Sequence, residues 1–309
     1  MKKVLLAAPR GYCAGVDRAV QIVERALETC DEPVYVRKEI VHNRHVVQEL
    51  EKRGAVFVDT EQEIPDGAVC IFSAHGVSPQ VRANAEARNL RVIDATCPLV
   101  TKVHLEAKKF ARSGRKIVLV GHEGHEEIEG TSGEAPDRTM VIDSVEKLDE
   151  LGVDRDEPIS YLTQTTLSVD DTLEVVEALR QRFDDIEGPR KDDICYATQN
   201  RQVAVKSIAG ESDVVLIVGA LNSSNSNRMV EVARKAGTPA YLVPDVADLD
   251  PSWLEGAEVV GVSSGASAPE VLVDRLLDRL RDLGYGEVET REVTSEDVTF
   301  SLPPWLRSS

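Results

Sequence analysis

The chain has 309 residues, an ordinary apolar fraction of 42 % and a formal net charge of −18. Its length predicts two or three α/β domains, and its acidic balance disfavours nucleic acid and acidic membrane surfaces as partners. No stretch approaches the roughly 20 apolar residues of a membrane-spanning helix, and the short apolar run after Lys2 and Lys3 is below the length of a signal peptide. We therefore expect a cytoplasmic protein without membrane or nucleic-acid partners.

Continuous apolar runs alternate with helical patterns along the chain. The runs predict strands at Lys3–Ala8, Ala68–Ser73, Lys116–Val120, Ile159–Leu162, Asp213–Val218 and Glu258–Val262. Apolar stripes at helical spacing predict helices at Val16–Glu28, Leu99–Ala111 and Pro269–Leu283. Uninterrupted apolar strands are typical of parallel sheets covered by helices on both faces. The pattern predicts an α/β fold with ligands at the carboxyl ends of the strands.

Three of the five cysteines directly precede a predicted helix. These are Cys13, Cys97 and Cys195, which lie about 85–100 residues apart, close to the size of a small α/β domain. A helix N-terminus stabilises a thiolate and suits metal or cluster ligation, although burial of an inert thiol is the alternative for each residue. Three thiolates on a four-iron cluster would leave one iron open for catalysis. Cys30 and Cys70 are predicted to be structural.

The cysteine spacing predicts three similar lobes that meet at a centre and supply one thiolate each. The expected boundaries are 14–97, 98–194 and 195–283, with the strand in 1–13 joining the third lobe. Residues 284–309 lack helical periodicity and are predicted to form a tail that packs across another lobe.

Histidines and threonines follow several of the predicted strands. His42 and His75 lie in strand-end loops, where each could donate a hydrogen bond to a phosphate or could have no role. His122 and His125 are three residues apart rather than the four of the zinc motif H-E-x-x-H, and the glycines around them predict a loop. One of the loop's glutamates could act as a general acid, but the residues alone do not identify which. The threonines of Thr163–Thr166 are candidates for a proton relay, and Ser168 with Asp171 predicts a helix cap.

Two later loops are predicted anion sites. Gly219–Asn227 and Gly265–Glu270 each join a strand to a helix and are rich in small hydrogen-bond donors. Free amides and hydroxyls at helix N-termini bind phosphate, although a capping box of Ser267 and Glu270 could by itself account for that serine. Neither loop matches a P-loop or G-x-G-x-x-G, which disfavours a nucleotide.

Eight short motifs occur in order along the chain, namely Pro9–Val16, Val41–Asn43, Ser73–Val77, Asp94–Pro98, Gly121–His125, Thr163–Thr166, Asp193–Thr198 and Asn222–Ser226. Together they resemble the motifs of the 4-hydroxy-3-methylbut-2-enyl diphosphate reductases, the IspH or LytB family. The resemblance implies three α/β lobes in a pseudo-threefold arrangement around one central [4Fe–4S] iron–sulfur cluster. It also implies three cysteine ligands, Cys13, Cys97 and Cys195.

The resemblance further implies the roles of the polar residues. The diphosphate of the substrate would be held by His42, His75, His125, Ser223, Asn225 and Ser267, with Ser224 nearby. Glu127 matches the family's proton donor, and Thr165 matches its relay partner. Glu126 departs from the pattern, since many relatives have proline at that position.

The activity implied by the resemblance is reductive dehydroxylation of the allylic diphosphate to isopentenyl and dimethylallyl diphosphate, the last step of the methylerythritol phosphate pathway. A ferredoxin or flavodoxin is the expected one-electron donor, and a basic cluster is a candidate docking patch, namely Lys102, Lys108, Lys109, Arg112, Arg115 and Lys116. Three alternatives are an iron–sulfur electron carrier or sensor, a regulatory binding protein, and a zinc-dependent phosphohydrolase that uses His122, His125 and Glu127.

Overall fold

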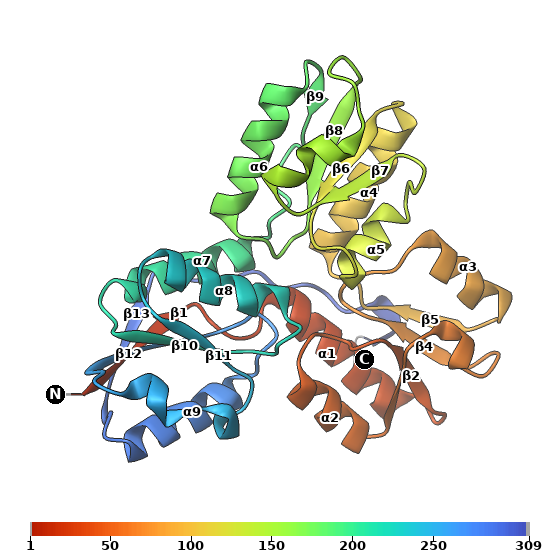
Figure 1. Ribbon diagram of the computed structural model, residues 1–309. Helices are drawn as coiled ribbons and strands as arrows, with labels where there is room; N and C mark the ends of the chain where they lie inside the picture. Colours follow the sequence, from red (N-terminus) through yellow and green to blue (C-terminus); the bar gives the residue numbers. More distant parts are fainter. Residues whose placement is uncertain (1, 307–309) are drawn as a thin grey trace. The chain divides into compact units, whose positions relative to one another are not determined.

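The computed structural model describes residues 2–306, which form two compact units. The first unit comprises the residues up to Val16, His42–Val46 and Tyr196–Thr299, and the second comprises Asp17–Val41, Val47–Cys195 and the residues from Phe300 onward. Figure 1 shows three sheets, each with its own helices, and every strand pair recorded in them is parallel. The predicted α/β class is confirmed.

The first unit contains a five-stranded sheet in the order β11-β10-β12-β1-β13. Its strands are β1 (Lys3–Ala8), β10 (Val214–Val218), β11 (Ala240–Val243), β12 (Val259–Ser264) and β13 (Glu287–Glu292). Its longer helices are α7 (Tyr196–Ala209), α8 (Ser224–Lys235) and α9 (Glu270–Asp282).

Helices cover both faces of this sheet, which explains its continuous apolar strands. Val4 and Leu6 of β1 share a buried cluster with Leu276 of α9. Leu5, the residue between them, packs with Ile208 of α7 on the opposite face. Successive side chains of a strand point to opposite faces, so the four buried positions of β1, Val4–Ala7, all carry apolar side chains.

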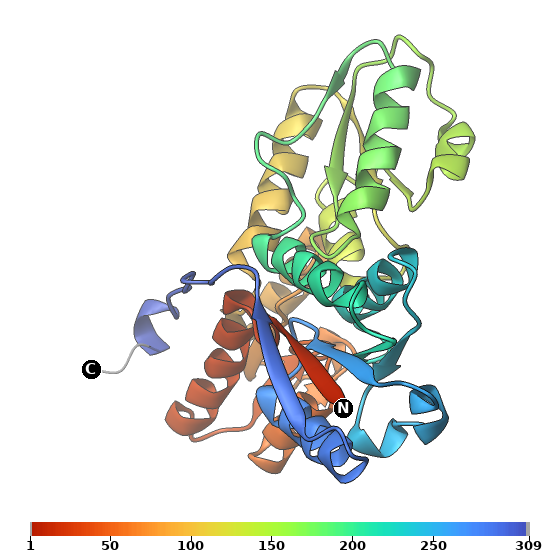
Figure 2. The same cartoon turned by 90° about the vertical axis from the view of Figure 1, so that its left-hand side faces the viewer.

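Strand β13 was not predicted. Figure 2 shows it beside β1, and the two strands pair in parallel from Lys3 with Glu287 to Ala8 with Glu292. Its sequence, EVETRE, is mostly charged. The strand lies at the edge of the sheet, and its side chains are exposed or half-buried, so they can carry charges. Farther along the tail, in the second unit, Ser301 O accepts a hydrogen bond from Arg18 Nε at 3.0 Å.

The second unit contains two four-stranded sheets, in the orders β3-β2-β4-β5 and β7-β6-β8-β9. The strands of the first are β2 (Val34–Arg37), β3 (Ala55–Val58), β4 (Val69–Phe72) and β5 (Arg91–Asp94). Those of the second are β6 (Lys116–Val120), β7 (Thr139–Ile142), β8 (Ile159–Thr163) and β9 (Ile186–Glu187). The helices are α1 (Ala14–Thr29) and α2 (Arg44–Lys52), whose first residues belong to the first unit, and α3 (Pro79–Ala87), α4 (Pro98–Arg112), α5 (Glu126–Ser132) and α6 (Val169–Arg182).

Apolar packing joins α4 and α5 to the second of these sheets. Val103 and Phe110 of α4 share a buried cluster with Ile117 of β6 and Ile128 of α5. In the other sheet, Cys70 lies fully buried in β4, and burial raises the pKa of its thiol to about 12. The structural role predicted for Cys70 fits this position, because such a thiol stays protonated.

The predicted strands and helices are all present, with ends shifted by at most two residues. The strands that were not predicted are short or lie at sheet edges, where the apolar run is too brief to be recognised. No helix in residues 2–306 combines the length and apolar composition that crossing a membrane requires.

Candidate functional site

Cys13, Cys97 and Cys195 occupy equivalent positions in the fold. Each immediately precedes a helix, α1, α4 and α7 respectively, and each is partly exposed and outside any disulfide. The backbone N–H of each donates to a loop that follows a strand: Cys13 to Ala266 O at 3.2 Å, Cys97 to Ala74 O at 3.0 Å and Cys195 to Thr165 O at 3.1 Å. Each thiol is therefore fixed beside a loop that carries predicted site residues.

In the first unit, the N-terminus of α8 is joined to the loop after β12. Ser223 caps α8, and its Oγ accepts hydrogen bonds from Ser226 N at 3.4 Å and Ser226 Oγ at 3.0 Å. Asn225 Oδ1 accepts from Ala266 N at 2.9 Å. Ser224 is the first residue of the helix. The predicted small donors thus surround one helix N-terminus.

His42 and Ser267 belong to the same connected set of residues. Ser267 Oγ donates to His42 O at 2.9 Å, and Asn222 Nδ2 lies 3.4 Å from His42 Nδ1. The predicted capping box of Ser267 and Glu270 is wrong. Helix α9 begins at Glu270 without a side-chain cap, because the Ser267 hydroxyl bonds to His42 and the Glu270 carboxylate accepts from Arg10 Nε at 3.0 Å.

In the second unit, Glu127 is a buried carboxyl group in the first turn of α5. It is 2 % exposed, and its two oxygens accept from Thr165 N at 2.6 Å and from Thr165 Oγ1 at 2.9 Å. Burial raises the pKa of Glu127 to about 7, although the hydrogen bonds from Thr165 oppose this shift. A large fraction of Glu127 is therefore protonated near neutral pH.

His125 and His75 are oriented by neighbouring groups in this unit. His125 Nδ1 accepts a hydrogen bond from Glu127 N at 3.2 Å, so the neutral imidazole carries its proton on Nε2. His75 Nδ1 lies 3.2 Å from Glu126 Oε2 and 3.3 Å from Ser73 Oγ. Ser73 and Glu126 have no role predicted from the sequence, yet both contact His75.

The position of Asp193, two residues before Cys195, is also fixed. Its carboxylate accepts from Thr163 N and from Lys102 Nζ, each at 2.9 Å. Burial raises the pKa of Asp193 to about 6, although Lys102 opposes the shift. This ion pair holds the segment that leads to Cys195 against the end of β8.

The predicted basic patch is largely neutralised. Five of its six cations pair with carboxylates: Lys102 with Asp193 at 2.9 Å, Lys108 with Glu134 at 3.0 Å, Lys109 with Glu187 at 3.7 Å, Arg115 with Asp185 at 2.7 Å and Lys116 with Glu157 at 2.7 Å. Adjacent opposite charges cancel at a distance, so the expected positive surface does not form there.

The residues of the zinc alternative do not form a metal-ligand set in the part of the chain that the structure describes. Both carboxylate oxygens of Glu127 accept hydrogen bonds from Thr165, and His125 Nδ1 accepts one from the backbone N–H of Glu127. His122 instead lies beside Gln164, with 3.4 Å between Nδ1 and Oε1. A zinc centre built from these three side chains is therefore disfavoured.

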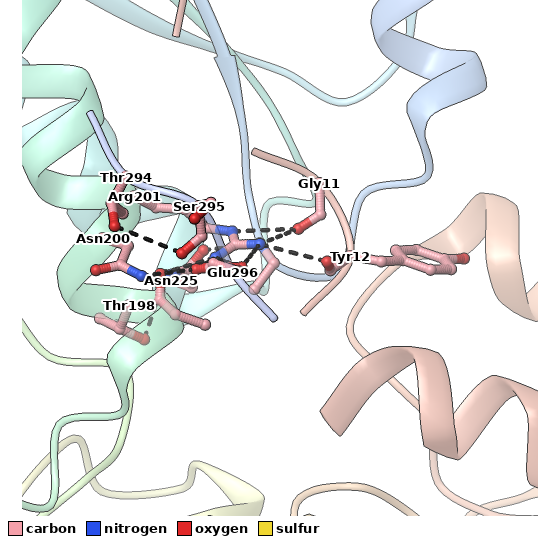
Figure 3. A network of polar contacts seen from close by, with 11 residues as sticks. Gly11, Tyr12, Thr198, Asn200, Arg201, Asn225, Thr294, Ser295 and Glu296 are labelled. Atoms are coloured by element: carbon pink, nitrogen blue, oxygen red, sulfur yellow. Dashed lines mark hydrogen bonds and ion pairs between the residues drawn. The ribbon is translucent and has the colours of Figure 1, made fainter. Parts of the chain in front are cut away.

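A buried arginine with no role predicted from the sequence organises the loop before Cys13. Arg201 of α7 is fully buried, and its guanidinium donates to Gly11 O at 2.7 Å and to Glu296 Oε1 at 3.0 Å (Figure 3). One turn earlier, Thr198 Oγ1 lies 3.5 Å from Asn225 Nδ2. Helix α7 therefore contacts both the loop of Cys13 and the start of α8.

The sequence model of one protein family, described as LytB protein, matches residues 4–281. The chain belongs to the LytB family. Curated relatives named 4-hydroxy-3-methylbut-2-enyl diphosphate reductase include those of Nocardia farcinica, 58 % identical over 100 % of this chain and 92 % of that protein, and Corynebacterium diphtheriae, 60 % identical over 99 % and 92 %.

Solved structures of this family have the same fold. The E-1-hydroxy-2-methyl-but-2-enyl-4-diphosphate reductase of Plasmodium falciparum is 37 % identical, with a TM-score of 0.95 over 99 % of this chain and 96 % of that one. A second structure, described as (E)-4-hydroxy-3-methyl-but-2-enyl diphosphate reductase, is 31 % identical, with a TM-score of 0.64 over 91 % of this chain and 100 % of that one.

Membership of this family implies an iron–sulfur cluster. The residues present fit such a group, since three partly exposed thiols that form no disulfide lie at helix N-termini, where the thiolate form is stabilised. Thiolates are also the protein ligands that iron–sulfur clusters prefer.

Proposed function

We propose that this chain is a reductase that converts 4-hydroxy-3-methylbut-2-enyl diphosphate to isopentenyl diphosphate and dimethylallyl diphosphate, the last step of the methylerythritol phosphate pathway. The observation that carries the proposal is the buried, readily protonated Glu127 held by both the backbone and the hydroxyl of Thr165. Loss of an allylic hydroxyl as water requires a proton at that oxygen, and such a carboxyl group can donate it.

Cys13, Cys97 and Cys195 would hold one [4Fe–4S] cluster. The proposed lobes are 14–97, 98–194 and 195–283 with 1–13, followed by the tail 284–309, and the three ligands would lie at the boundaries between these lobes. When bound, the cluster supplies electrons one at a time and Lewis acidity toward the substrate oxygen. The backbone hydrogen bond of each cysteine would keep its thiolate in place during electron transfer.

The diphosphate would be bound by seven residues, namely His42, His75, His125, Ser223, Ser224, Asn225 and Ser267. The start of α8 is rich in backbone amides and serine hydroxyls, the donors that bind anions at helix N-termini. His125 can donate from Nε2 because its Nδ1 already accepts from the backbone. These donors bind a diphosphate without needing a net positive surface, which agrees with the formal charge of −18.

Glu127 would donate the proton that turns the leaving hydroxyl into water. Thr165 holds the carboxyl group in one orientation, because its N–H and hydroxyl bind different oxygens of Glu127. The same threonine accepts the Cys195 backbone hydrogen bond, so the acid and that cysteine are positioned by one residue. The low exposure of Glu127 would limit the access of bulk water to this carboxyl group.

The electron donor would be a ferredoxin or a flavodoxin, which delivers single electrons, and the location would be the cytoplasm. The deciding experiment is anaerobic purification followed by iron and sulfide analysis. The protein is then assayed for reduction of 4-hydroxy-3-methylbut-2-enyl diphosphate with dithionite and a viologen mediator. We expect about four irons and four sulfides per chain and formation of both products. A loaded protein that reduces no substrate would instead be an electron carrier or sensor.

Replacement of Cys97 by serine is expected to reduce iron and sulfide content to less than about half, because a hydroxyl is a much poorer ligand than a thiolate for iron–sulfur clusters. The matched control is Cys70→Ser, which alters a buried thiol outside the proposed site. Visible absorbance and iron analysis of anaerobic samples measure the effect. Equal iron loss in both variants would contradict the assignment of Cys97 as a ligand.

Gly219→Ala is expected to weaken binding of inorganic diphosphate by about tenfold. A Cβ at Gly219 would lie 2.2 Å from Ser226 Oγ and 2.5 Å from Ser226 Cβ, so the first turn of α8 would have to move. Gly210→Ala is the control, because a Cβ there meets no atom within 4 Å. Isothermal titration with diphosphate measures both variants, and unchanged affinity in Gly219→Ala would argue against the α8 site.

A further inference from the structure

The proposed reaction consumes protons at a buried site. Removal of the hydroxyl follows R–OH + 2 H⁺ + 2 e⁻ → R–H + H₂O, so Glu127 must be reprotonated in every cycle in which it acts as the acid. Glu127 is only 2 % exposed. The need for a route by which protons return to this carboxyl group rests on the proposed function.

A polar stripe leads from Glu127 along one side of α5. Thr131 lies four residues after Glu127, one helical turn away, and Glu134 follows just beyond the end of the helix. Residues spaced by three, four or seven positions share a helix face. At Gly130, in the middle of this face, a Cβ would lie 3.2 Å from the ring of His104, so glycine allows the imidazole to approach the helix.

His104 connects this stripe to the surface. Its Nδ1 lies 2.8 Å from Glu134 Oε1, and Glu134 Oε2 lies 3.0 Å from Lys108 Nζ. The side chains of His104 and Glu134 are 7 % and 3 % exposed, whereas that of Lys108 is 41 % exposed. His104 and Lys108 are one turn apart on α4. The row of polar groups therefore runs from solvent into the interior.

Two polar atoms of this row of residues have no hydrogen-bond partner among the described residues. They are His104 Nε2 and Thr131 Oγ1, and both are buried. Buried polar atoms of this kind are usually satisfied by bound water. Burial raises the pKa of Glu127 and a charge on His104 opposes that shift, so the two groups are close enough to interact electrostatically.

We propose that His104 and Glu134 form a proton-supply path to Glu127. A proton from solvent passes by way of the Glu134 carboxylate, beside Lys108, to His104 Nδ1. Burial opposes the shift, but hydrogen bonds from His104 and Lys108 lower the pKa of Glu134, so this carboxylate carries the proton only transiently. The ring then releases a proton from Nε2, through the Thr131 hydroxyl and a bound water, to the Glu127 carboxylate. Each transfer breaks one O–H or N–H bond and forms another, and no electron moves. Imidazole suits this task because it can accept a proton at one nitrogen and release one from the other.

The test compares His104→Gln with the wild-type holoenzyme, reduced by dithionite so that no protein donor contributes. The glutamine side-chain amide can still donate a hydrogen bond to Glu134, but unlike imidazole it cannot accept and release a proton. We expect kcat to fall by about tenfold or more, and the ratio of kcat in H₂O to kcat in D₂O to increase. KM and iron content should remain within about twofold of wild type, because the substrate and cofactor ligands are untouched.

Glu134→Gln provides a second variant in case His104→Gln does not fold, and it should change kcat and the isotope effect in the same direction. Glu129→Gln is the matched control, because Glu129 is an exposed residue of α5. Unchanged kcat and isotope effect in the relay variants would overturn the path, as would a parallel loss of iron or rise in KM. Absence of turnover in the wild type would instead refute the proposed function.

Discussion

Replacement of Glu127 by glutamine is expected to lower turnover by about a thousandfold, within the range that positioned acids contribute to catalysis. Glutamine can keep the contacts to Thr165 N and Oγ1 but has no acidic proton. Iron content and diphosphate affinity should therefore remain at the wild-type level. The measurement is anaerobic reduction of the allylic diphosphate, with Glu123→Gln as control, since Glu123 is exposed in the preceding loop. Near-normal turnover would refute Glu127 as the proton donor.

The same variant should be more stable than the wild type at alkaline pH. Burial raises the pKa of Glu127 from its ordinary value of 4.5 to about 7, so between these values the folded protein binds more protons at this residue than the unfolded chain. Stability therefore decreases as pH rises through this interval, by up to about 3 kcal/mol. Glutamine does not titrate and avoids this loss. Thermal unfolding of the wild type and of Glu127→Gln at pH 5 and pH 8 measures this loss of stability. The same pH dependence of stability in both proteins would contradict the raised pKa of Glu127.

Arg201→Met is expected to lower the free energy of unfolding by about 3–5 kcal/mol and to reduce iron content. The substitution leaves the Glu296 carboxylate, whose side chain is only 13 % exposed, without its buried cation. It also removes the donors to Gly11 O and Tyr12 O, directly before Cys13 (Figure 3). Urea unfolding and iron analysis of anaerobic protein measure the two effects.

A double variant separates charge from packing in this network. Arg201→Met combined with Glu296→Gln should recover part of the lost stability, because no uncompensated carboxylate then remains buried. The control is Arg291→Met, since the ion pair of Arg291 with Glu211 is largely exposed and should contribute less than about 1 kcal/mol. If the double variant were no more stable than Arg201→Met, the unpaired charge would not be the cause of the loss.

Local patterns were sufficient for much of the fold. The strand Lys116–Val120 was predicted with its observed bounds because every residue but the first is buried, and a fully buried strand must be continuously apolar. Strand β13 could not be recognised in the same way. Its residues gain backbone hydrogen bonds from β1 at the sheet edge, and that pairing leaves no apolar signature in EVETRE.

In the candidate site, too, some features are visible in the local sequence and others arise only from tertiary contacts. Cysteines before helices, and small donors between strands and helices, are visible as local sequence features. The four glutamates of the loop after β6 are not distinguishable by such features, and only the family resemblance singled out Glu127. In the structure Glu127 is 2 % exposed while Glu129 is exposed, because α5 begins at Glu126 and turns Glu127 toward Thr165, a residue of a distant segment.

By itself, therefore, the sequence determined the α/β class, the main buried strands and the position of Cys13, Cys97 and Cys195 at helix starts. Each of these depends on interactions between residues that are near one another in the chain. The tertiary structure alone decided that Glu127 is buried against Thr165, that Ser267 bonds to His42 rather than capping α9, and that His104 lies on Gly130. These contacts join segments distant in sequence, and their energies arise from burial and hydrogen-bond geometry that exist only after folding.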